Sequence, residues 1–149
     1  MRSVLIYLTH ATEPEVADWL QQRYPLQQGP PWIAERVGDA VLYIDIYRDL
    51  DTEFEVETYF SLLECLGAEP TLSIIADVSG RHPGDTEVYE LVCSALSAFE
   101  GVAQDEYTDH CWSLEEIEQA QQREGHPFFD YRGWYESEGI TDKRGAGEK

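Results

Sequence analysis

Lysine is almost missing from this chain, and positive charge as a whole is scarce. Lys and Arg together number 10 against 30 Asp and Glu, so the formal net charge of the 149 residues is −20 at pH 7. A field of this sign repels the phosphates of nucleic acids and the surfaces of anionic membranes. We therefore expect neither nucleic acid nor a membrane among the partners. The preference for Arg over Lys is typical of a GC-rich bacterial genome.

Cysteine is scarce as well, and its spacing suits neither crosslinks nor metal binding. The three cysteines are Cys65, Cys93 and Cys111, an odd number of widely separated thiols without a CxxC pair. This pattern predicts neither a disulfide framework nor a zinc knuckle. Cys65 and Cys93 fall within apolar helical patterns, which indicates buried thiols.

Long apolar runs and targeting signals are absent too. No stretch approaches the ~20 apolar residues of a membrane span. The short apolar run at the start lacks the length and the cleavage site of a signal peptide, so we expect a cytoplasmic protein. The length and the 42% of hydrophobic residues predict one domain over residues 1–149. Residues 141–149 have the composition of a frayed C-terminal end.

Catalytic motifs are the last absence. The sequence contains no P-loop, no GxSxG nucleophile elbow and no HExxH zinc motif. We therefore expect a protein that is not an enzyme, with no catalytic residue, no cofactor and no metal.

The apolar residues that are present recur with clear periods. Alternation and β-branched content predict strands at residues 4–9, 32–37, 40–47, 71–78 and 101–104. Helical spacing and capping residues predict helices beginning at Thr12, Thr52, Asp85 and Ser113. The first six elements match a ferredoxin-like βαββαβ core, with both of its helices on one face of the sheet. The predicted class is α+β, completed by C-terminal helices and an irregular aromatic tail from Gly125 onward.

Acidic residues concentrate in two runs that are interleaved with aromatic residues. The first run spans residues 45–57 and the second spans residues 105–118. Helix capping and the helix dipole account for some of these acids, at roughly 0.3–1 kcal/mol each. Aromatic anchors among desolvated charges are typical of protein interfaces. The predicted partner-binding residues are Tyr47, Asp49, Asp51, Glu53, Asp105, Glu106, Tyr107, Asp109 and Trp112.

Two polar stretches leave other functions open. Asp109 and His110, joined by the distant Asp77 and His82, hold the ligand types of a metal-dependent hydrolase. The loop over residues 77–85 follows a predicted strand, where α/β proteins often bind ligands. A small-ligand or regulatory domain of ferredoxin-like type, acting through self-association, is a further alternative.

Three stretches carry a resemblance to a known class of protein. Residues 76–80, 101–105 and 107–114 resemble stretches of the immunity proteins of bacterial polymorphic toxin systems. The resemblance implies a stoichiometric inhibitor whose partner is a cognate basic protein, a secreted toxin domain that is often a nuclease. Together with the acidic charge, it predicts an immunity protein that acts as a monomer or a small homo-oligomer.

Overall fold

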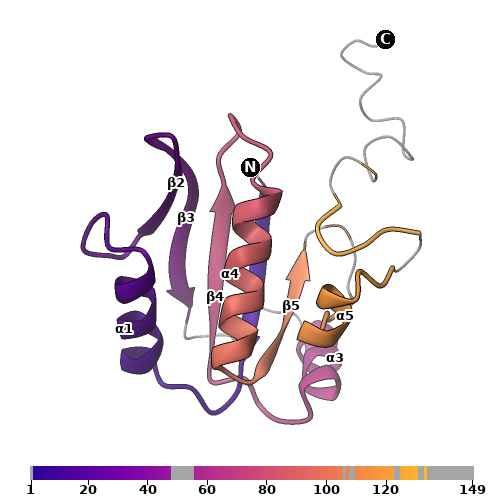
Figure 1. The fold of residues 1–149 in the computed structure, drawn as a ribbon. Coiled ribbons are helices and arrows are strands. Elements are labelled where there is room, and N and C mark those ends of the chain that lie inside the picture. The colour runs from indigo at the N-terminus through magenta and orange to yellow at the C-terminus, as the bar shows by residue number, and fades with distance from the viewer. Residues whose placement is uncertain are drawn as a thin grey trace.

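A computed structural model describes residues 2–47, 56–105, 107, 110–122, 125–130 and 133 of the chain (Figure 1). Strands and helices follow one another along the chain. They are β1 (Arg2–Leu8), α1 (Glu13–Arg23), β2 (Trp32–Arg36), β3 (Asp39–Tyr47), α3 (Val56–Leu66), β4 (Leu72–Val78), α4 (Asp85–Ala98), β5 (Gly101–Asp105) and α5 (Leu114–Glu118). Among the described helices, none combines the length and the apolar character that crossing a bilayer requires.

The strands form one five-stranded sheet in the order β2-β3-β4-β1-β5, and each neighbouring pair is antiparallel. The α+β class is therefore confirmed. A ferredoxin-like strand order is not confirmed, because β4 pairs with β3 on one side and with β1 on the other. Ala76 of β4 lies opposite Ile44 in the first pairing and opposite Val4 in the second. The element order along the chain does not fix which strands become neighbours.

The helices cover both faces of the sheet. Val4, Ile6 and Leu8 of β1 point to the face on which α1 and α4 pack, and they belong to the main core. Tyr7 points to the opposite face and belongs to a smaller cluster with Leu62 of α3. The expectation that both helices of the βαββαβ run share a face is therefore wrong. Alternate side chains of β1 are apolar on both faces, so each face can hold a helix.

Capping residues start two of the helices as expected. Thr12 and Glu15 form a capping box at the start of α1, and Ser113 and Glu116 form another at α5. The α5 helix is short and ends at Glu118. The helix start predicted at Thr52 lies outside the described residues. The expectation of a buried thiol is wrong for Cys65 of α3, which is exposed, whereas Cys93 of α4 is half-buried.

The aromatic segment after α5 is irregular and docks on the body, in its described part. Phe129 is buried, and its backbone N–H donates to Oδ2 of the buried Asp105 carboxylate at 2.7 Å. The Phe128 ring meets the buried Trp112 ring edge-on, with the centroids 5.8 Å apart. The segment therefore forms a wall beside α4 and α5.

Candidate partner-binding face

Four of the nine predicted partner-binding residues have a described environment. Tyr47 at the end of β3 is 43% exposed. Tyr107 is half-buried, and its ring lies 6.1 Å from the ring of Phe129. Asp105 and Trp112 are buried. Asp49, Asp51, Glu53, Glu106 and Asp109 lie outside the described residues.

The burial of Asp105 and Trp112 corrects the prediction that they contact a partner. The Asp105 carboxylate accepts the backbone N–H groups of Tyr107 and Phe129, so it holds the C-terminal segment in place. Trp112 bridges to Ala103 of β5 through two backbone hydrogen bonds and packs its ring in the main core. Both residues build the fold, because a buried side chain presents no surface to a second protein.

The residues of the alternative metal site have separate partners. His82 Nε2 lies 2.9 Å from Asp39 Oδ2, and His110 Nε2 lies 3.1 Å from Glu116 Oε1. Asp77 accepts a hydrogen bond from the Ser3 hydroxyl at 2.6 Å. Within the described ranges, no group of three His, Cys, Asp or Glu side chains is placed to hold a metal ion. Asp109, the fourth residue of that prediction, is outside these ranges.

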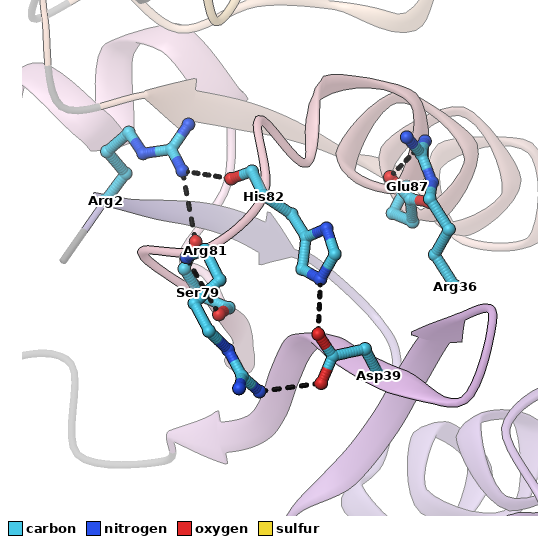
Figure 2. A network of polar contacts seen from close by, with 7 residues as sticks. All are labelled: Arg2, Arg36, Asp39, Ser79, Arg81, His82 and Glu87. Carbon is cyan, nitrogen blue, oxygen red and sulfur yellow. Dashed lines mark hydrogen bonds and ion pairs between the residues drawn. The ribbon is translucent and has the colours of Figure 1, made fainter.

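The loop that follows β4 is tied into a polar network at one end of the sheet (Figure 2). The Arg2 guanidinium donates to the Pro83 carbonyl at 2.6 Å and also to the carbonyls of Ser79 and His82. Asp39 lies at the start of β3. Its Oδ1 accepts a hydrogen bond from a terminal nitrogen of Arg81 at 2.7 Å, and its Oδ2 faces the His82 ring. These contacts fasten the loop to β1 and to the β2–β3 hairpin, so the loop predicted to bind a ligand is braced by side chains of the protein itself.

A second ion pair completes the sheet-end network. Arg36, the last residue of β2, forms a two-pronged contact with Glu87 of α4, at 2.8 Å from Nε and 3.0 Å from the terminal nitrogen. The sheet-end network is defined as Arg2, Arg36, Asp39, Arg81, His82 and Glu87. Both of its carboxylates are paired with basic groups of the network, and the Arg2 guanidinium is held by backbone carbonyls. Its arrangement serves to hold the hairpin, the loop and α4 together.

The outer side of α4 carries two acids that, unlike those of the sheet-end network, have no ion partner among the described residues. Asp85 and Glu90 are exposed, and neither forms a hydrogen bond or an ion pair with any described residue. Asp85 stands in the first helical turn, where an acid is favoured by the helix dipole. Glu90 lies beyond that turn, so the dipole does not explain it. Between them Tyr89 is 45% exposed.

A groove runs along each side of this stretch of α4, which lies between α1 and α5 in Figure 1. The α4–tail groove has a volume of about 420 Å³ and separates α4 from α5 and the docked segment. Its apolar walls include Tyr89, Ile117 and Phe128. The α4–α1 groove has a volume of about 410 Å³ and a mixed lining. Tyr24, Leu26 and Ile33 contribute apolar surface, and charged residues that include Arg23 and Glu35 lie among them. Glu90 borders both grooves.

Tyr89 fixes the geometry of the α4–tail groove. Its hydroxyl donates to the Ile117 carbonyl at 3.4 Å, which joins α4 to α5. Desolvation raises the pKa of the Tyr89 phenol, and the nearby Cys93 thiol and Glu118 carboxylate raise it further. The phenol therefore stays neutral and able to donate around neutral pH.

These features define the α4 face: Asp85, Tyr89, Glu90 and the two grooves beside them. Its chemistry suits a cationic surface that carries apolar side chains, because exposed acids without an ion partner in the described chain lie next to the apolar wall of the α4–tail groove. One feature of the sequence indicates that the α4 face is exposed. Val88, Leu91 and Val92 form the buried stripe of α4, which leaves Tyr89 and Glu90 off the stripe. The groove walls come from distant segments and have no such signal.

Comparison with known proteins identifies no relative of this chain: no family model, no curated protein and no solved structure matches it.

Proposed function

We propose that this protein is a cytoplasmic, stoichiometric binding protein, an immunity-type inhibitor that neutralises a cognate bacterial toxin through its α4 face. The observation that carries the proposal is the position of Asp85 and Glu90. Neither acid has an ion partner among the described residues. Both border the α4–tail groove with its apolar wall, and Glu90 also borders the α4–α1 groove. An acid at such a place gains a partner when a basic surface covers it.

The charge of the whole chain supports the same partner chemistry. A net charge of −20 attracts a basic protein over a long range and accelerates its approach. The resemblance of residues 76–114 to immunity proteins supplies the class of partner, a toxin domain with a basic active site. The acids provide steering, and the grooves provide the contact area that keeps the complex together.

Two exposed-surface variants test the proposal. Tyr89→Ala with Glu90→Arg alters the α4 face, whereas Phe60→Ala with Glu64→Arg makes the same kind of change on α3. Phe60 is 60% exposed, Glu64 is exposed, and α3 packs on the opposite face of the sheet. A basic partner is first captured at low salt and identified, and its affinity is then measured with purified proteins.

We expect the α4 variant to lose at least about tenfold in affinity, which corresponds to about 1.4 kcal/mol, and the α3 variant to bind as the wild type does. Association should slow steeply as salt is added. The second readout is protection of cells that express the toxin domain. Equal affinity and equal protection by both variants would rule out the α4 face, and a captured partner without toxic activity would rule out the immunity role.

A further inference from the structure

The α4–tail groove has walls and a rim of different chemistry. Tyr89 and Phe128 supply aromatic surface, and the buried side chains of Val88 and Ile117 also line the groove. The lining includes three acids, Asp85, Glu90 and Asp130, and the described residues that line the groove include no Lys, Arg or His. In its described part, the groove therefore combines apolar walls with acidic groups.

Only two of these three carboxylates are available to a ligand. Asp130 is occupied, because its Oδ2 lies 3.0 Å from the His126 ring and its Oδ1 accepts the Gly133 N–H at 3.1 Å. Asp85 and Glu90 have no partner in the part of the chain that the structure describes. An apolar occupant would desolvate these two carboxylates without compensation, which is costly. A cationic occupant compensates them.

We infer that the α4–tail groove is a socket for an arginine side chain of the partner, an inference that rests on the proposed function. A guanidinium is planar and weakly hydrated, so it stacks on the Tyr89 or Phe128 ring while its N–H groups face Asp85 and Glu90. The methylene stem of the arginine covers the apolar wall at Ile117. A lysine ammonium has the charge but no plane to stack.

The shape of the groove favours a side chain carried by a protein over a free small cation. Tyr89 is 45% exposed, and both Asp85 and Glu90 are exposed, so the groove is open along its rim. Small-molecule sites usually enclose most of their ligand. Glu90 also borders the α4–α1 groove, so the socket continues into a wider surface that a protein can cover.

The test uses acetyl-Gly-Arg-Gly-amide as the probe and the same peptide with citrulline, the uncharged isostere of arginine, as its match. Both are titrated into the full-length ¹⁵N-labelled protein and followed by NMR. We expect saturable amide shifts at residues 85–90 and 128–130 with the arginine peptide. The citrulline peptide should bind about tenfold more weakly, as an ion pair plus a stacked cation predicts.

Variants locate the site and separate it from nonspecific attraction. Glu90→Gln and Tyr89→Ala should each weaken the arginine peptide severalfold, and Glu64→Gln on α3 should change nothing. Tyr89→Phe keeps the ring for stacking and loses the hydroxyl contact to the Ile117 carbonyl, so it should bind the peptide more tightly than Tyr89→Ala does. Equal binding of the two peptides, or shifts spread over the surface, would overturn the socket.

The outcomes also distinguish this inference from the proposed function. If Tyr89→Ala with Glu90→Arg abolishes partner binding while the arginine peptide fails to bind, the α4 face stands and the socket is wrong. If the peptide binds but the same variant leaves partner binding unchanged, arginine of the partner does not use the groove and both proposals fail. Support for the socket requires that the α4 variants lose affinity both for the partner and for the arginine peptide.

Discussion

The sheet-end network and the α4 face share one helix, α4, yet they differ in whether their acids are paired with basic groups. In the network Glu87 is held by Arg36, and Asp39 is held by Arg81 and His82. Three residues further along α4, Glu90 has no partner among the described residues. A chain with 10 basic residues for 30 acidic ones cannot pair every acid.

This difference separates acids that hold the fold together from acids that are available. Paired groups restrain the hairpin, the loop and α4, so their loss should appear as lost stability. Unpaired exposed acids contribute little to stability and add to self-repulsion, so their loss should appear in binding. Stability measurements on matched variants can therefore test whether the two groups of acids differ in this way.

The largest effect is expected beneath the α4 face, at Trp112. Its ring is 1% exposed and supports Phe128, which walls the α4–tail groove. Trp112→Ala should lower the free energy of unfolding by about 3–5 kcal/mol, measured by chemical denaturation. Within the described part of the chain, the indole N–H has no acceptor. Trp112→Phe, which keeps a ring, should therefore cost much less, and equal losses would contradict this view of the site.

The next effect is expected at Arg2 in the sheet-end network. Its guanidinium donates to three carbonyls of the loop between β4 and α4. Arg2→Ala leaves these carbonyls without their charged donor and should cost about 2 kcal/mol in thermal or chemical unfolding. Arg2→Lys keeps the charge but has one nitrogen where Arg2 uses two, so it should recover only part of the loss. Full recovery by Lys would show that the charge alone matters.

A clear difference in the loss of stability is expected between Glu87 and Glu90, two acids of one helix. Glu87→Gln should cost about 1 kcal/mol, because it breaks the two-pronged contact with Arg36. Glu90→Gln should leave stability within about 0.5 kcal/mol of the wild type. A double-mutant cycle with Arg36→Gln measures the coupling to each acid. A coupling to Glu90 as large as that to Glu87 would remove the distinction between the two regions.

The smallest effect is a gain, at the tip of the hairpin that the network braces. Val37 has φ of 53° and is 99% exposed, so a β-branched residue adopts a left-handed conformation without burial in return. Gly38 follows with φ of 79°, and Asn-Gly is the preferred pair for such a turn. Val37→Asn should raise the free energy of unfolding by about 0.5–1 kcal/mol. An unchanged or lower melting temperature would count against strain at this position.

Several elements could be predicted from the sequence because their causes are local. The capping boxes at Thr12 and Ser113 act over three residues, and both are present. The strand at residues 40–47 was predicted from alternation, and the structure has β3 at Asp39–Tyr47 with Leu42 and Ile44 buried. The α+β class followed from the order of these elements.

The candidate site could not be predicted in the same way. The acidic run after β5 predicted surface contacts, but Asp105 turned inward because the backbone of Phe129, 24 residues away, needs an acceptor. The groove beside Tyr89 needs α5 and the docked segment as its walls. Contacts over such separations leave no period or spacing in the sequence.

The sign and size of the charge, the helix starts at Thr12 and Ser113 and the alternation of the strands follow from the amino-acid sequence, since each depends on composition or on neighbours within a few residues. The place of β4 between β3 and β1, and the packing of α1 and α3 on opposite faces, depend on the tertiary structure. It also decided which acids are paired. The reason is physical: an acid is neutralised by whatever basic group folding brings within about 4 Å, and that distance is set by the packing of the whole chain.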